Sequence, residues 1–473
     1  MPKLTGFPAV ALPGPPPTPL LGALPHLLRF VDDPIGALRR LRPYGDVVGV
    51  VRDSPALVCV FGPERNREVL SNIRLFRNDE EFLPWPPESL LARMQRGMVA
   101  INGDLHKRHR RLMQPAFSRS ALRSYADDIV RVTEGLVTKW PRGQIADLDR
   151  LTRDLALCVA VQCFFGLDVL AGVVELGELA AAYVERVVSP LTMALPFDLP
   201  GLPYRKTARL GTRMLESLGA LIARKRTDAA PGNDVLSLLL RAHDDDGTGF
   251  SEDELISEAA TLFVAGHETM AKTLMWALFA LERHPAVLID VLDEVDGVLG
   301  GRTITPEDIP EMPLMDRVIK EVMRVFPAVP ITFPRVPAEE AALGGVTLPK
   351  GANVIVSPFA THHDPELYPE PERFRPERWE TIRPSTYEYL PFGAGPRTCV
   401  GTAFAQQALR LMLPTILQHA RVSLVPYQDV SRRTRANILR ARDGVKVRVQ
   451  GAHRRRVEPA PIRGDIGEIV ALA

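Results

Sequence analysis

Residues 392–401 read Phe-Gly-Ala-Gly-Pro-Arg-Thr-Cys-Val-Gly and form the most informative segment of the chain. The segment places Cys399 in a glycine-rich loop that runs into an apolar helical pattern beginning at Thr402. Backbone N–H groups, the positive end of that helix and the nearby Arg397 would stabilise a thiolate. The glycines would let the backbone approach a flat ligand closely. The alternative is a buried structural cysteine, and a nucleophilic role would need a histidine that this segment lacks.

The composition is that of an ordinary globular protein. The chain has 473 residues, and 58 Lys and Arg balance 57 Asp and Glu, which argues against a nucleic-acid-binding protein. At about 150 residues per domain this length would allow three domains. We find no linker, however, and predict a single domain over residues 1–452. Four cysteines are too few for a disulfide framework and favour the cytoplasm.

The two ends of the chain are polar or rich in proline. Residues 13–19 (PGPPPTP) cannot be helical and predict an extended N-terminal arm over about residues 1–25. No apolar stretch reaches the roughly 20 residues of a membrane span, and no signal peptide is recognisable. Residues 453–473 mix charge, proline and glycine, so we expect a flexible tail. The sequence therefore predicts a soluble protein without a membrane span.

Periodicity predicts a mainly α protein with a small β region. The alternation in residues 46–62 predicts a β-hairpin, and residues 343–358 predict a second strand-turn-strand unit. Most of the chain after Leu105 has helical periodicity. The clearest of these helical stretches cover residues 121–139, 149–165, 209–224 and 234–243.

The helix that should begin after Ser251 is exceptional. Ser251 and Glu254 have the spacing of a capping box, and the following 30 residues are apolar on nearly all sides, as in a helix buried in a large protein. Within it, Gly266 costs about 1 kcal/mol relative to Ala, and Glu268 costs more unless it is paired. These costs point to a functional segment. Alternatively, the Glu268 side chain extends to an edge of the protein, and Gly266 only allows a neighbouring helix to pack closely.

Together these motifs resemble the cytochrome P450 family. Phe392, Gly395, Arg397, Cys399 and Gly401 match the family's haem-ligand loop, a ten-residue pattern of high specificity. Three more motifs follow the family's order: Glu-x-x-Arg at 321–324, Phe-Arg-Pro-Glu-Arg at 374–378 and Ala-Gly-His-Glu-Thr at 265–269. The resemblance covers nearly the whole chain and is to the soluble bacterial type. It implies a fold that holds haem between the long central helix and the cysteine loop.

The resemblance assigns the cofactor-binding residues. Cys399 would be the iron ligand, and an axial thiolate favours O–O cleavage. The haem propionates would be bound by His106, Arg110, Arg335 and Arg397. The basic run over residues 106–111 could instead be a solvated helix face.

The resemblance also assigns a buried structural triad, Glu321, Arg324 and Arg378. In isolation, a Glu-x-x-Arg motif would more often be a surface ion pair. The triad reading depends on the other motifs.

The segment 265–269 would serve oxygen activation. Glu268 and Thr269 resemble the acid–alcohol pair that relays protons into the pocket, and Ala265 and Gly266 would lie beside the haem, with Gly266 leaving room for oxygen. Met270 and Ala408 depart from the family, which often has a hydroxyl and a glutamate there. We expect small changes in pocket polarity and helix packing from these two departures.

These roles imply a haem-dependent monooxygenase that hydroxylates or epoxidises a lipophilic small molecule. Haem b and O2 would be its cofactors, with NAD(P)H acting indirectly through a ferredoxin or flavodoxin and its reductase. The apolar segments 82–94, 187–204 and 328–333 would contact the substrate. The expected docking residues are Lys107, Arg108, Arg111 and Arg410. Use of hydrogen peroxide in place of oxygen, and a non-catalytic haem sensor or ligand-binding protein, remain as alternatives.

Overall fold

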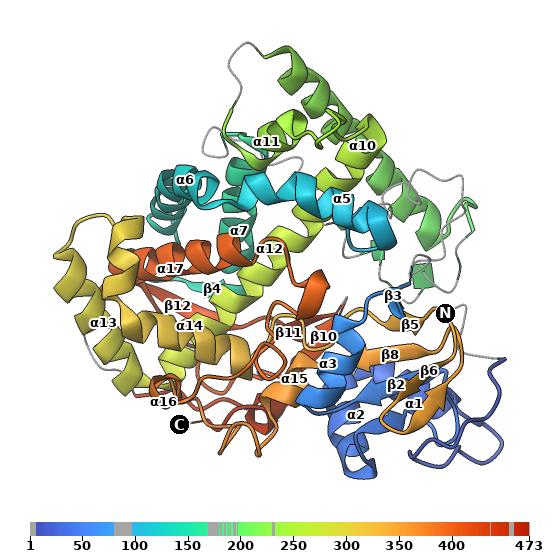
Figure 1. The fold of residues 1–473 in the computed structure, drawn as a ribbon. Coiled ribbons are helices and arrows are strands. Elements are labelled where there is room, and N and C mark those ends of the chain that lie inside the picture. Colours follow the sequence, from blue (N-terminus) through green and yellow to red (C-terminus); the bar gives the residue numbers. More distant parts are fainter. Residues whose placement is uncertain are drawn as a thin grey trace.

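The long helix α12 (Glu252–Arg283) runs through the middle of the molecule in the computed structural model, between other helices and the sheet region (Figure 1). Its first turn has the predicted capping box, in which Ser251 Oγ accepts from the N–H of Glu254 at 3.3 Å and the Glu254 carboxylate accepts from the N–H of Ser251 at 2.8 Å. The structure describes residues 6–79, 97–168, 197–228, 232–435, 437–453 and 458–472, and single positions between 179 and 195.

Helices account for most of the ordered elements, as the periodicity predicts. The four predicted stretches correspond to α6, α7, α10 and α11, of which α10 starts earlier, at Pro203. The α-helices are α1 (Leu24–Asp32), α2 (Pro34–Leu41), α3 (Pro63–Ser71), α5 (Gly103–Met113), α6 (Arg119–Val137), α7 (Leu148–Phe165), α10 (Pro203–Thr227), α11 (Val235–Arg241), α12, α13 (Pro285–Leu299), α14 (Pro313–Val325), α15 (Pro358–His362), α16 (Arg378–Thr381) and α17 (Thr402–His419).

The strands of the described chain form four small sheets. Their bounds are β1 (Val47–Gly49), β2 (Leu57–Val60), β3 (Phe76–Asn78), β4 (Ile145–Asp147), β5 (Arg335–Pro337), β6 (Ala341–Leu343), β7 (Val346–Leu348), β8 (Asn353–Val356), β9 (Ala420–Leu424), β10 (Arg432–Arg435), β11 (Ile438–Ala441) and β12 (Lys446–Gly451). The largest sheet has the order β1-β2-β8-β5-β3, and the others are β4-β12-β9, β10-β11 and β6-β7.

Both predicted β segments contain strands, but only the first forms a hairpin of its own. The hairpin over residues 46–62 is confirmed, with Val47 opposite Val60. Residues 343–358 do contain β7 and β8, but β7 pairs with β6, and β8 runs parallel to β2. The physical reason lies in β8 itself: Val354, Ile355 and Val356 are all buried, as expected for a strand covered on both faces.

The two ends of the chain differ in how well they match expectation. The N-terminal arm is extended, and Pro13 O accepts a hydrogen bond from the N–H of Gly49 at 2.9 Å. The expected flexible tail is wrong for residues 458–472, because Ile466 and Ile469 are fully buried in the main core. The charged residues around these isoleucines hide their apolar spacing in the sequence. Within the described residues no helix has the length and hydropathy to span a membrane.

Candidate active site

Cys399 lies in a loop with a tightly constrained backbone. The Cys399 N–H donates to Phe392 O at 2.9 Å, and α17 begins three residues later. Gly395 has φ +72°, and a Cβ there would overlap the backbone carbonyl of Leu70, lying 3.0 Å from its carbon. Only glycine fits this position, since L side chains avoid that φ and the space is filled. Cys399 is an exposed residue by its accessible surface, although protein atoms surround the thiol densely enough to desolvate it.

Two opposing effects act on the Cys399 thiol. Desolvation by the surrounding protein raises its pKa above the ordinary value. The N–H of Gly401, the charge of Arg110 and the hydroxyl of Thr402 act in the opposite direction and lower it, but do not outweigh desolvation. A thiol of this kind is protonated at neutral pH and loses its proton when it binds a metal ion.

Three arginines and one histidine from three segments form a cationic cluster beside the cysteine loop. His106 and Arg110 lie one turn apart on α5, Arg335 begins β5, and Arg397 ends the short 3-10 helix η5 (Gly395–Arg397). Arg110 Nη1 donates to Thr398 O at 2.7 Å, and Arg397 Nη2 donates to Ile101 O at 2.6 Å. These bonds join the cysteine loop to the last turn of α5 and to the segment that precedes this helix.

The cationic cluster needs an anionic partner. His106 and Arg335 are 2% and 7% exposed, and within the described chain His106 Nδ1 and Arg335 Nε and Nη1 have no hydrogen-bond partner. Desolvation, followed by the positive charge of Arg397, lowers the pKa of His106 to about 4 and that of Arg335 to about 10. Leaving such donors unpaired is costly, so a carboxylate-bearing ligand fits here. The cluster therefore suits the two propionates of haem.

The structure brings Glu321, Arg324 and Arg378 together as one buried network. Glu321 accepts from Arg324 Nε and Nη2 and from Arg378 Nε, each at 2.9 Å. Trp379 Nε1 and the backbone N–H of Arg375 donate to the same carboxylate at 3.0 and 2.8 Å. The network thereby joins α14 to the segment around α16, and the tryptophan and backbone donors could not be read from the motifs.

Ala265 and Thr269 share one face of α12, but Gly266 faces elsewhere. Ala265 is exposed, and Thr269 Oγ1 donates to its carbonyl at 2.8 Å. A Cβ on Gly266 would lie 3.0 Å from Cζ of Phe164 on α7 and closer still to Cε2. The alternative, that Gly266 admits a neighbouring helix, is what the structure shows. The other predicted role of Gly266, leaving room for oxygen beside the haem, stays a prediction.

Glu268 is buried in a cluster of charged side chains and does not extend to the edge of the protein. It is 7% exposed, and Lys272 Nζ, one turn along α12, lies 3.3 Å from its Oε2. Arg153 on α7 and Arg440 on β11 also form ion pairs with the Glu268 carboxylate, at 3.2 and 3.6 Å. Lys272 is fully buried and was missed at the sequence level. Its i, i+4 spacing from Glu268 was the signal that could have revealed it.

The family model for "Cytochrome P450" matches residues 12–449. The chain belongs to the cytochrome P450 family. This match confirms the mainly α fold and the class of enzyme, a haem-dependent monooxygenase.

Characterised relatives cover most of this cytochrome P450. Cyclooctat-9-en-7-ol 5-monooxygenase of Streptomyces melanosporofaciens is 32% identical over 86% of the chain and 88% of the relative. Pentalenene oxygenase of Streptomyces avermitilis is 30% identical over 86% and 92%. The solved structure of retinoic acid-bound cyanobacterial CYP120A1 superposes with a TM-score of 0.80, at 25% identity, over 94% of this chain and all of that one.

The substrate-contact segments of this cytochrome P450 are only partly visible. Residues 82–94 lie outside the described residues, and 187–204 are described in part. In the third segment Ile331 is buried and Phe333 is 38% exposed, which agrees with an apolar lining.

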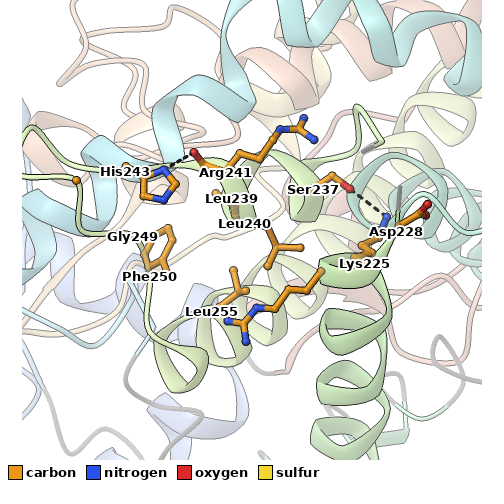
Figure 2. A pocket seen from close by; sticks show the side chains of 12 residues that line it. Lys225, Asp228, Ser237, Leu239, Leu240, Arg241, His243, Gly249, Phe250 and Leu255 are labelled. Carbon is orange, nitrogen blue, oxygen red and sulfur yellow. Dashed lines mark hydrogen bonds between the residues drawn. The ribbon is translucent and has the colours of Figure 1, made fainter. Parts of the chain in front are cut away.

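A separate cavity of about 420 Å³ lies between the end of α10, α11 and the segment after it. Figure 2 shows Lys225 and Ser237 on one side of it and His243 and Phe250 on the other. The Lys225 ammonium donates to Ser237 Oγ at 3.1 Å, and His243 Nδ1 lies 2.7 Å from the Arg241 carbonyl oxygen. None of its lining residues belongs to the cysteine loop or the cationic cluster, so we assign it no part in the reaction.

The residues expected to dock a redox partner all form ion pairs within the chain. Lys107 pairs with Asp104, Arg108 and Arg111 with Asp244, and Arg410 with Asp316, at 2.5 to 2.8 Å. Arg108 also contacts Glu254 and is only 23% exposed. These acids offset most of the positive charge, so a basic docking patch is not supported here.

Proposed function

We propose that this cytochrome P450 hydroxylates or epoxidises a cyclic terpenoid, with electrons delivered from NAD(P)H by a separate ferredoxin or flavodoxin and its reductase. The relatives named above support the substrate class, because both are oxygenases of terpene substrates. The partly exposed Phe333 beside the buried Ile331, and the exposed Ala265, suit such a ligand, since a hydrocarbon is held by shape more than by hydrogen bonds.

We assign the haem contacts to residues that already converge in space. Haem bound on the Cys399 thiolate supplies the iron that activates dioxygen. His106, Arg110, Arg335 and Arg397 would hold its propionates. The observation that carries this assignment is the set of buried, unpartnered donors on His106 and Arg335 beside the exposed cysteine.

We assign proton delivery to Thr269 and Glu268. The Thr269 hydroxyl lies on the same face of α12 as Ala265, and Glu268 precedes it in the chain. A carboxyl group and a hydroxyl acting one after the other can pass a proton from the buried charged cluster to the face of α12 that carries Ala265 and Thr269. The apolar side chains around this face would exclude bulk water.

The haem assignment is tested by the absorption spectrum of the dithionite-reduced holoprotein with carbon monoxide. We expect the strongly red-shifted Soret band of a thiolate ligand, its loss in Cys399→His, and no change in the matched control Cys158→Ala. Cys158 is a buried cysteine on α7, and the resemblance gives it no ligand role. A Soret band typical of a neutral ligand in the wild type would overturn the assignment.

The substrate class is tested by binding and turnover. Cyclic terpenes at micromolar concentration should shift the spin state of the haem iron. With a surrogate ferredoxin, its reductase and NADPH, the enzyme should convert them to oxygenated products. Binding without turnover by any redox partner would favour a non-catalytic ligand-binding protein. Turnover with hydrogen peroxide alone, at the same rate, would contradict the need for redox partners.

Four free cysteines also fit a reducing compartment, and we propose the cytoplasm as the location.

A further inference from the structure

His109 on α5 is enclosed between two carboxylates of α12. Its side chain is fully buried, with Nδ1 2.7 Å from Glu258 Oε1 and Nε2 3.2 Å from Glu254 Oε1. Phe250 packs edge-on against the imidazole, with ring centroids 5.1 Å apart. A neutral imidazole has a single N–H, so only the protonated ring can donate to both carboxylates. The geometry therefore favours an imidazolium held between two glutamates that lie one turn apart.

The charges around His109 come from α12, from α5 itself and from the segment between α11 and α12. On α5, Arg108 Nη1 donates to Glu254 at 3.1 Å, and His106 lies one turn before His109. Asp244, in the segment after α11, binds Arg108 at 2.8 Å. Desolvation lowers the pKa of His109, but the two glutamates outweigh it and hold that pKa above its ordinary value. The ring therefore stays charged to a higher pH than an ordinary histidine.

The helix that carries His109 also carries half of the cationic cluster. His106 and Arg110 lie within one turn of His109 on α5, and Arg110 reaches the cysteine loop through Thr398. Because a helix is stiff over one turn, the contact of His109 with α12 fixes where these two side chains lie. The ion pair thus sets the position of α5 relative to α12.

Glu258 also contacts the segment that precedes α5. Desolvation raises the pKa of Glu258, whereas His109 and the backbone N–H of Met98 act in the opposite direction by stabilising its charge. The carbonyl of the same Met98 accepts from Arg397 Nη1 at 3.3 Å. This segment lies directly against α12, since a Cβ on Gly97 would be 3.0 Å from Ser257 O. One buried carboxylate therefore touches both α5 and the segment that binds Arg397.

We propose that His109 and Glu258 are positioning residues for the cationic cluster that binds the haem propionates. Their ion pair holds α5 and the segment before it against α12, so that His106, Arg110 and Arg397 converge on the propionates. When the imidazolium loses its proton, one of its two buried carboxylate contacts loses its donor, and the cluster is held less firmly. The inference rests on the propionate assignment made above and adds the contact that keeps the cluster in place.

The first test observes the protonation of His109 directly. Nitrogen-15 spectra of the histidine-labelled holoprotein, in its diamagnetic reduced form with carbon monoxide, follow the ring nitrogens against pH, and His109→Gln assigns the signal. His109 should titrate above the ordinary value of 6.5. In Glu258→Gln the amide oxygen can still accept a hydrogen bond but carries no charge, so the titration should move to lower pH. A ring that is neutral throughout in the wild type would overturn the inference.

The second test measures haem retention, as the rate of haem transfer from the holoprotein to excess apomyoglobin. The ion pair is intact while His109 is charged and is lost as pH rises through its raised pKa. The wild-type rate should therefore rise by about tenfold across that titration. In His109→Gln the rate should be high at every pH, and in Glu258→Gln the step should move to lower pH. Packing alone would not move this step.

The matched control is His284→Gln. His284 is a partly buried histidine at the other end of α12, where its Nδ1 lies 2.8 Å from Ala280 O. This variant should keep the wild-type pH profile of haem transfer. A His109→Gln profile that equals the wild-type profile would overturn the inference. If His109→Gln yields no folded holoprotein, a pH step left unmoved by Glu258→Gln would overturn it instead.

Failure of the propionate assignment would be seen separately, because neither test needs a substrate or a redox partner. Arg335→Leu removes a member of the cluster that lies on β5, away from α5 and the segment before it, and should release haem faster at every pH. Wild-type retention in Arg335→Leu would refute the assignment, and the inference with it. Faster loss in Arg335→Leu together with an unchanged His109→Gln profile would leave the assignment standing and remove only the positioning roles.

Discussion

Gly266→Ala separates the two roles that can be given to this glycine. The added Cβ would lie 3.0 Å from Phe164 Cζ and nearer to Cε2. The ring cannot simply turn away, because it is 3% exposed and packs against Phe404 with centroids 5.0 Å apart. Overpacking of this kind costs about 1–3 kcal/mol, whereas replacing Gly by Ala in a helix gains about 1 kcal/mol. The free energy of unfolding should therefore fall by about 0–2 kcal/mol.

The same substitution should change sign when Phe164 is shortened. In a Phe164→Leu background the clash is relieved and only the helix propensity remains, so Gly266→Ala should stabilise by about 1 kcal/mol. Urea unfolding of the four holoproteins measures this coupling. Equal costs in both backgrounds would refute the packing role. A weaker affinity for carbon monoxide in both backgrounds, without coupling, would instead support a place beside the haem ligand.

Three further outcomes follow from buried contacts. Arg324→Ala should leave the Glu321 charge poorly paired at a cost of about 3–5 kcal/mol, and purified protein should contain little haem, whereas normal haem content would contradict this. Desolvation raises the pKa of Glu254, but its hydrogen bonds from Ser251 and the cations beside it lower it to about 2. The stability it contributes is therefore present above pH 4.5 and lost as pH falls toward 2, and Glu254→Gln should flatten the acid limb of a stability–pH curve. Ile466→Ala should lower the free energy of unfolding, measured by urea unfolding, by about 2–5 kcal/mol as for a core residue, whereas a flexible tail would give no change.

Short-range spacing was a good guide to the site and to most helices. Glu321 and Arg324 lie within one helical turn, and the cysteine loop spans only ten residues. The local sequence therefore determines most of the geometry of both. The partnership of β8 with β2 joins residues 57–60 to 353–356, and no local pattern encodes it. The burial of Ile466 likewise depends on a core formed elsewhere in the chain.

Glu268 shows where local reasoning ends. An acid in an apolar helix implies that cations must lie near it, because an unpaired buried charge is too costly. Lys272 was within reach of that argument, being one turn away. Asp149 was not, because it neutralises Lys272 across 123 positions of sequence. Asp149 matters to this cluster because it gives Lys272 a second counter-ion beside Glu268. The two charges that α7 contributes, those of Asp149 and Arg153, are thus set by the packing of α7 against α12.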